Sequence, residues 1–74
     1  MKLRAIIKSK TVKSMGKPVA SIEIAIEEGA LYLFRQGVNG EPLGDTWHQN
    51  LEEAISQAKF EFSVDAADWE HIED

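Results

Sequence analysis

Two tight-turn signals constrain this chain more than any other feature, because each one forces the flanking segments to lie antiparallel. Glu28-Gly29 follows an alternating apolar segment at 19–27, and Asn39-Gly40 follows a second strand-like segment at 30–36. Glycine tolerates the positive φ that a two-residue hairpin loop needs, and Asn-Gly favours such loops strongly. The sequence therefore predicts neighbouring antiparallel strands at 19–27, 30–36 and 42–48.

One further strand and one helix flank these three strands. Residues 1–8 alternate between apolar and basic side chains with the period of a half-buried strand. Asn50 is placed to cap a helix, with Glu53 reaching back to it, and apolar residues recur at helical spacing from Leu51 to Phe62. One amphipathic helix covers one face of a sheet. The sequence thus predicts an α+β fold, a four-stranded antiparallel meander with one C-terminal helix packed on one face (ββββα, two layers).

Length and composition limit the other possibilities. The chain has 74 residues, which predicts a single domain spanning 1–74. Hydrophobic residues make up 43% and charged residues 28%, as in ordinary globular chains. The chain has no Cys, no apolar run near the roughly 20 residues of a membrane span, and no apolar core of a secretion signal. These features predict a cytoplasmic protein with no membrane partner.

Positive charge is concentrated at the start of the chain, although the net charge is −5. Residues 1–17 contain six Lys or Arg and no acid, and only Arg35 and Lys59 accompany the 13 acids of the remainder. One interpretation is internal pairing, with a basic strand at 1–8 lying across from an acidic strand at 19–27. The other is a surface for nucleic acid, since clustered lysines displace counterions from phosphates. The residues of that alternative are Lys8, Lys10, Lys13 and Lys17.

A two-residue loop at each turn would place three aromatic residues on the sheet face away from the helix. Counting outward from the turns sets Tyr32 opposite Trp47 and Phe34 opposite Asp45. A slip of one residue at either turn would send the aromatics inward instead. Aromatic residues gathered on a polar face are typical of a contact surface. Two alternatives remain: the tail with Trp69 covers this face, or the aromatics only stabilise the sheet by cross-strand pairing.

The sequence contains no recognisable arrangement of catalytic or metal-binding residues. There is no phosphate-binding glycine loop, no nucleophile elbow and no His pair at ligand spacing. His48 is interpreted as an exposed or helix-adjacent side chain, and the acids after Asp65 as a solvated tail in which Trp69 folds back to close the core. The sequence therefore predicts no catalytic residue, no metal, no cofactor and no enzymatic activity.

Residues 46–54 (TWHQNLEEA), residues 57–62 (QAKFEF) and Trp69 form a recurring pattern, in which a Leu-Glu-Glu-Ala segment opens a helix that ends in an aromatic-acid-aromatic run followed by a Trp. Through this pattern, the last third of the chain resembles a family of small uncharacterised bacterial proteins. The resemblance implies a strand meander with a C-terminal helix and a bacterial source. It implies no activity, ligand or catalytic residue.

Together these features predict a non-enzymatic interaction module that uses the open sheet face around Tyr32, Phe34 and Trp47. Its partner is expected to be another protein or a second copy of the chain, as in a homodimer. The alternative is a nucleic-acid-binding domain that uses the basic N-terminal strand and loop, with the same aromatics as a stacking platform. The acidic total disfavours that alternative.

Overall fold

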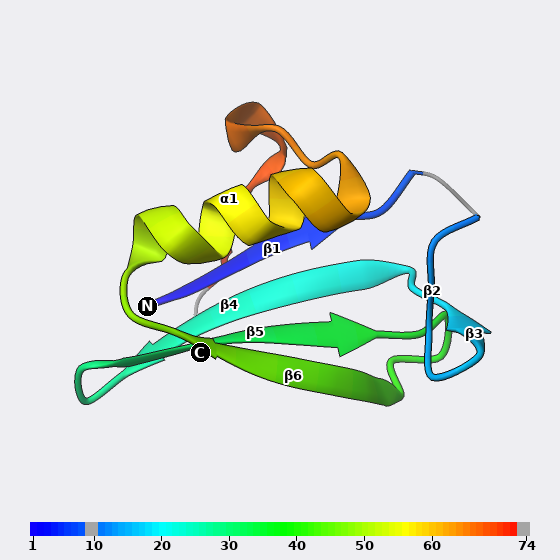
Figure 1. Cartoon of the computed structure of the whole chain (residues 1–74), viewed down its shortest axis with the longest axis horizontal. Coiled ribbons are helices and arrows are strands. Elements are labelled where there is room, and N and C mark those ends of the chain that lie inside the picture. The colour runs from blue at the N-terminus through cyan, green and yellow to red at the C-terminus, as the bar shows by residue number, and fades with distance from the viewer. Residues whose placement is uncertain (9–10, 73–74) are drawn as a thin grey trace.

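The computed structural model describes residues 1–8 and 11–72. In this part of the chain, a five-stranded antiparallel sheet is accompanied by one α-helix and a two-stranded sheet (Figure 1). The elements are β1 (Lys2–Ile6), β2 (Lys13–Ser14), β3 (Lys17–Pro18), β4 (Ser21–Glu27), β5 (Ala30–Gln36), β6 (Pro42–His48), α1 (Leu51–Phe62), the 3-10 turn η1 (Ala66–Asp68) and β7 (Glu70–Ile72). The predicted α+β class is confirmed.

The strand order of the main sheet is β6-β5-β4-β1-β7. Strands β1, β4, β5 and β6 are therefore neighbours in the predicted order. The sheet contains the four predicted strands and one more, because residues 70–72 of the expected solvated tail pair with the outer edge of β1, with Ile72 opposite Lys2. A strand this short carries no readable period, and its partner lies at the other end of the chain. Pairing there covers backbone groups that an edge strand would otherwise leave open.

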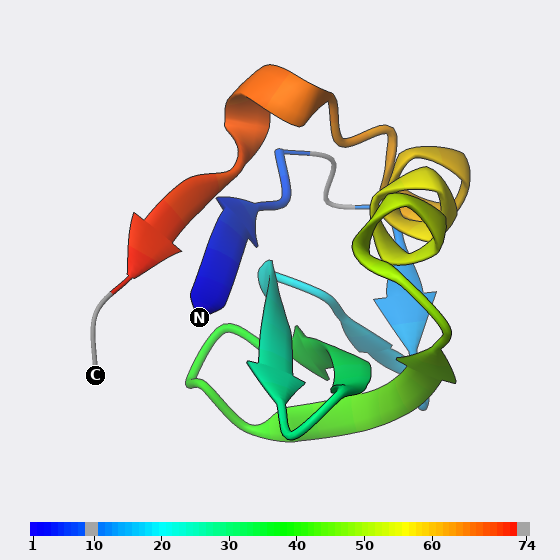
Figure 2. The ribbon, with the colours of Figure 1, turned by 90° about the vertical axis from the view of Figure 1, so that its left-hand side faces the viewer.

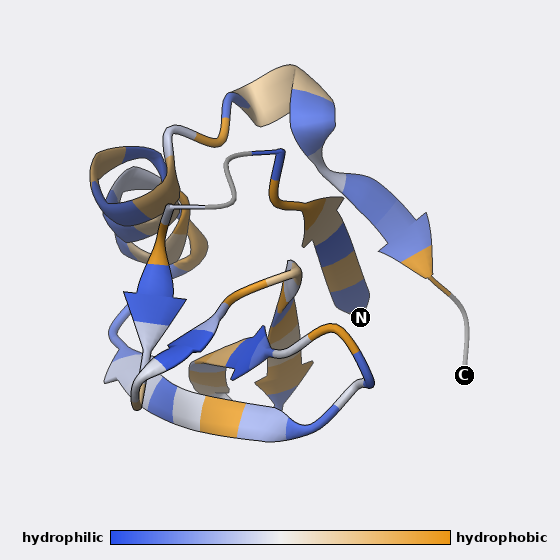
Figure 3. Cartoon of the chain, turned by 90° about the vertical axis from the view of Figure 1, so that its right-hand side faces the viewer, coloured by the Kyte–Doolittle hydropathy of each residue, from blue (hydrophilic) through white to orange (hydrophobic). Residues whose placement is uncertain are grey.

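The core lies between α1 and one face of the main sheet. The central strands contribute Ile22, Ile24 and Leu33, all fully buried, and α1 contributes Ala58 and Phe62. Figure 2 shows the curved sheet with α1 on one side of it. Figure 3 shows hydrophobic and hydrophilic residues alternating along β1, the pattern that buries one side of a strand. Burial of each large aliphatic side chain contributes roughly 1.5–3 kcal/mol.

The start of α1 follows from its cap. The side chain of Asn50 accepts a hydrogen bond from the backbone N–H of Glu53 at 2.8 Å, as predicted. The carboxylate of Glu53 lies 3.3 Å from Nδ1 of His48, rather than on the backbone of Asn50. The helix ends at Phe62 and is followed by Ser63, whose φ of 59° is left-handed. Among the described residues, no helix has the length and apolar character that crossing a membrane requires.

The first predicted turn has the predicted form. Glu28 and Gly29 have φ values of 47° and 81°, and they connect Glu27 to its partner Ala30. A second turn of this kind, at Met15 and Gly16 with φ values of 54° and 77°, joins β2 to β3 in what the sequence indicates only as a loop.

The second predicted turn has a different form. The N–H of Gly37 donates to the carbonyl of Glu41 at 2.9 Å, so the hairpin loop contains three residues instead of the predicted two. This longer loop pairs Gln36 with Pro42, and a register shift follows between Gln36 and Phe34. There Arg35 faces two residues of β6, Leu43 and Gly44, which is a β-bulge.

The three-residue loop and the β-bulge have opposite effects on the register between β5 and β6. The loop moves the register by one residue, and the extra residue of β6 at the bulge moves it back. Phe34 therefore lies opposite Asp45, and Tyr32 lies opposite Trp47, as predicted. These two pairings are confirmed, although the turn that was expected to produce them is not the one present.

Candidate functional site

The three aromatic residues lie on the sheet face away from α1, which we call the open face. Trp47 is 58% exposed, Tyr32 is 36% exposed and Phe34 is half-buried. The ring centroids of Tyr32 and Phe34 are 6.0 Å apart, with 33° between the planes. We call these three residues the aromatic patch. It spans β5 and β6, since Trp47 lies directly across from Tyr32.

The open face is organised in transverse rows, because paired residues of neighbouring strands point to the same side of a sheet. The first row contains Ile72, Lys2, Ala25, Tyr32 and Trp47. The second row contains Glu70, Arg4, Glu23, Phe34 and Asp45. The aromatic patch thus lies on β5 and β6 in these rows, and most of the charged side chains lie on the strands beside it.

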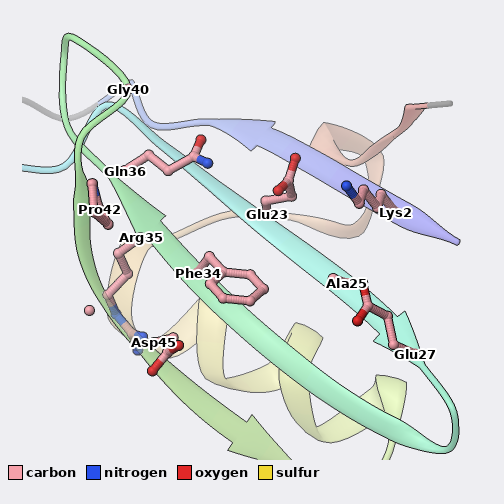
Figure 4. A pocket seen from close by; sticks show the side chains of 11 residues that line it. Lys2, Glu23, Ala25, Glu27, Phe34, Arg35, Gln36, Gly40, Pro42 and Asp45 are labelled. Atoms are coloured by element: carbon pink, nitrogen blue, oxygen red, sulfur yellow. The ribbon is translucent and has the colours of Figure 1, made fainter. Parts of the chain in front are cut away.

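A depression of about 420 Å³ lies on the open face next to the aromatic patch (Figure 4). Phe34 lies near its centre, between Glu23 of β4 and Asp45 of β6. Glu27 and Lys2 line the end towards the Glu28-Gly29 turn. Its lining therefore combines one aromatic residue with three acidic and two basic residues, the latter being Lys2 and Arg35.

The predicted pairing of the basic first strand with the acidic second one is confirmed for one pair. Nη2 of Arg4 lies 3.8 Å from Oε1 of Glu23, directly across the two strands. Such partly exposed pairs contribute only about 0.2–1 kcal/mol, so this pair favours the register more than it stabilises the fold. Lys8 does not take part, because β1 ends at Ile6; its Nζ lies 3.8 Å from Oδ1 of Asp68.

The structure does not bring the loop lysines to the aromatic patch. Lys13 and Lys17 lie on the β2–β3 hairpin, which is attached to the start of β6 where the hydroxyl of Ser14 donates to the carbonyl of Leu43 at 2.6 Å. Trp47 lies near the other end of β6, and Lys10 falls outside the described residues. The combined surface that the nucleic-acid alternative requires is therefore not assembled by the described lysines.

One lysine of the β2–β3 hairpin, Lys17, attracts the nearby carboxylate of Glu41. Backbone hydrogen bonds from Glu41 itself and from Asn39 lower the pKa of the Glu41 carboxyl, and attraction by Lys17 lowers it further. The Asn39 N–H donates to Oε1 of Glu41 at 2.9 Å. Lys17 thus lies beside an acid of the β5–β6 loop, which weakens it as a phosphate ligand.

The alternative in which the tail covers the open face is wrong for the described residues. Trp69 is partly buried and packs against the core, as predicted, and β7 continues from it as an edge strand beside β1. The tail therefore extends the sheet sideways and leaves the aromatic patch uncovered.

A second group of polar residues, which the sequence did not reveal, lies between the sheet and α1. The side chain of Arg35 is only 7% exposed, and it donates from Nε and Nη2 to the two carboxylate oxygens of Glu61 at 2.8 and 2.7 Å. The guanidinium carbon lies 5.6 Å from the ring centroid of Phe62. These hydrogen bonds lower the pKa of Glu61, with burial opposing them and Gln57 assisting. The alternation Leu31, Leu33, Arg35 was the available signal that Arg35 points inward.

His48 belongs to the same group. Its Nε2 lies 2.8 Å from the hydroxyl of Thr46, and its Nδ1 contacts Glu53 of α1, so the helix-adjacent placement is confirmed. Nη1 of Arg35 reaches the same hydroxyl at 3.4 Å. Asp45 points to the opposite face of the sheet from His48, so His48 and Asp45 do not form an acid–base pair. The polar side chains of this group hydrogen-bond to one another, and these bonds hold α1 against β5 and β6.

The described residues contain no group of three or more His, Cys, Asp or Glu side chains placed to hold a metal ion. Comparison with protein-family models, with curated proteins and with solved structures gave no match to this chain. The resemblance of its C-terminal third to small bacterial proteins therefore stays a prediction. The open face, with its aromatic patch and depression, is the candidate site.

Proposed function

We propose that this protein is a non-enzymatic interaction module that binds a protein partner through the aromatic patch on its open face. The observation that carries this proposal is the exposure of Trp47 and Tyr32 side by side on a face that no described segment covers. Large amphipathic rings are enriched at protein interfaces and supply most of the contact energy there.

The exposure that remains after cross-strand pairing supports a contact role for the patch. A pair such as Tyr32 and Trp47 stabilises a sheet by about 0.2–1 kcal/mol relative to alanines. Trp47 remains 58% exposed in that pair. Burial of the remaining apolar surface requires a further molecule, and this favours a contact role over a purely structural one.

The open face also has a suitable size. A typical stable interface covers about 800 Å² on each partner, which is about one sixth of the 4936 Å² surface of this chain. One face of a small domain supplies such an area.

The test compares association of the wild-type chain with that of a variant carrying Tyr32→Ser, Phe34→Ser and Trp47→Ser. Light scattering measures self-association, and cross-linking followed by affinity capture measures other partners. We expect the triple variant to lose the association that the wild type shows. The single variant Trp47→Ser, monitored by circular dichroism, separates loss of binding from loss of folding.

Phe60→Ser is the matched control. Phe60 is 88% exposed on α1, so this variant removes an aromatic ring from another surface and should leave association unchanged. A monomeric wild type whose captured partners all persist in the triple variant would show that the patch is not a binding surface.

A further inference from the structure

We propose that the open face binds a basic protein segment by seating an arginine side chain in the depression over the ring of Phe34. This inference rests on the proposed function and specifies the chemistry of the partner. It starts from the second transverse row, in which Glu23, Phe34 and Asp45 lie side by side on β4, β5 and β6. Neighbouring strands are about 4.8 Å apart, so a carboxylate flanks the ring on each side. Figure 4 shows the three side chains in this order.

The depression has a small excess of negative charge. Glu23, Glu27 and Asp45 line it together with Lys2 and Arg35. The guanidinium of Arg35 is already bound by the carboxylate of Glu61. Glu23 is already paired with Arg4. No ion pair joins Asp45 or Glu27 to another residue among 1–8 and 11–72. An incoming cation would therefore find carboxylates whose charge is not yet neutralised, and complementary charge also speeds encounter with a basic partner.

Arginine suits this arrangement better than a compact cation. Its guanidinium is flat, stacks on aromatic faces and presents five donors in a fixed fork that matches carboxylates. A depression of about 420 Å³ lies within the roughly 300–1,000 Å³ range of binding pockets and accommodates a long side chain with part of its neighbours. An aromatic ring flanked by two carboxylates thus offers a guanidinium one surface to stack on and hydrogen-bond acceptors on both sides.

The chain itself contains an example of this recognition. On the opposite side of the sheet, the guanidinium of Arg35 lies over the ring of Phe62 and donates two hydrogen bonds to Glu61. The same three chemical groups meet there, with the arginine supplied internally. On the open face, the ring and the carboxylates are present and the arginine would come from the partner.

A second copy of the chain is a weaker candidate for this role. Arg4, the arginine on the open face, is held by Glu23, and two chains of net charge −5 repel one another. A basic segment of another protein is attracted by the same charge. The proposal therefore commits to a basic peptide segment.

The experiment titrates the ¹⁵N-labelled full chain at low salt with three synthetic peptides that differ only at three positions, all Arg, all Lys or all Gln. Amide resonances report the binding site, and calorimetry gives the dissociation constant. We expect the Arg peptide to shift resonances around Phe34 and Asp45, and the Lys and Gln peptides to bind several-fold more weakly.

Two variants and one control identify the contacts. Asp45→Asn removes a flanking charge, and Phe34→Leu removes the ring but keeps an apolar side chain; each should weaken binding of the Arg peptide by about three- to ten-fold. Glu52→Gln removes the same charge from the exposed first turn of α1 and should leave binding within twofold. An equal effect of Glu52→Gln and Asp45→Asn, or equal binding of the Arg and Lys peptides, would overturn the proposal.

The outcomes also separate this inference from the proposed function. Binding of the Gln peptide or of a second copy at the open face, with the Arg peptide no better, would refute the arginine but retain the face as a protein-binding surface. Binding of single-stranded RNA there in preference to every peptide would refute both. Unchanged partner capture by the triple serine variant, with no peptide shifting open-face resonances, would likewise refute both.

Discussion

Arg35 and Glu61 form a two-point ion pair between β5 and α1, with donor–acceptor distances of 2.8 and 2.7 Å. The arginine side chain is 7% exposed and the glutamate side chain 30% exposed, so the guanidinium depends on this partner far more than the carboxylate does. The pair fixes the direction in which α1 crosses the sheet. It also keeps the only inward-pointing cation of β5 neutralised within the core.

Glu61→Ala should destabilise the protein by about 2–4 kcal/mol, because it leaves a buried guanidinium without its acceptor. Urea denaturation measures the loss. The double variant Arg35→Met with Glu61→Leu should recover most of it, since apolar residues of similar volume replace the pair without burying an unpaired charge. If the double variant is no more stable than Glu61→Ala, the cost arises from lost packing and not from the unpaired charge.

The same pair makes stability depend on pH. The pKa of Glu61 in the folded protein lies below its ordinary value of 4.5, chiefly because of the hydrogen bonds from Arg35. The stabilisation is therefore fully present above about pH 4.5, where the unfolded chain is also ionised, and is lost as pH falls through the lower folded pKa. Urea denaturation between pH 3 and 7 should show this decline.

Glu61→Gln should flatten the decline below pH 4.5. Glu41, whose pKa is also lowered, lies outside the core and provides the comparison. Glu41→Gln removes the contribution of Glu41 to the pH dependence of stability and keeps that of Glu61. Parallel acid profiles for the wild type and Glu61→Gln would mean that other carboxyls govern the acid transition.

Two phenylalanines of α1, two positions apart, should differ strongly in their effect on stability. Phe62 is 4% exposed, whereas Phe60 is 88% exposed. Phe62→Ala should cost about 3–5 kcal/mol, which is close to the whole stability of a domain of this size. Phe60→Ala should change it by no more than about 0.5 kcal/mol. Thermal unfolding followed by circular dichroism compares the two; similar melting temperatures would contradict the orientation of α1.

Local patterns predicted the parts of the fold that depend on neighbouring residues. The ranges 30–36, 42–48 and 51–62 are those of β5, β6 and α1, since turn glycines, strand alternation and the cap at Asn50 act over a few positions. Ile55 lies on the predicted apolar stripe, yet it is only partly buried at the edge of the core, because the close contact with the sheet falls at Ala54 and Ala58.

The features that the sequence did not predict depend on partners far along the chain. Strand β7 exists because β1 offers it an edge, and its three residues have no period of their own. Arg35 could be placed inward by alternation, but its partner Glu61 is 26 positions away and is also compatible with a solvated helix surface. The pairings of Tyr32 and Phe34 across to β6 match the prediction because the bulge at Gly44 compensates for a loop that is one residue longer than predicted.

The bulge at Gly44 provides a final prediction, because it reconciles a three-residue loop with the register of the aromatic patch. Gly44 has a φ of 100°, which side chains of L residues rarely adopt, so Gly44→Ala should destabilise the protein by about 1–3 kcal/mol. Deletion of Gly44 removes the bulge altogether and leaves one residue of β6 opposite Arg35. The pairs Phe34 with Asp45 and Tyr32 with Trp47 should then persist, and cross-strand nuclear Overhauser contacts measure them. Loss of these contacts in the deletion variant, with the fold retained, would show that the loop does not set the register and that the bulge itself does.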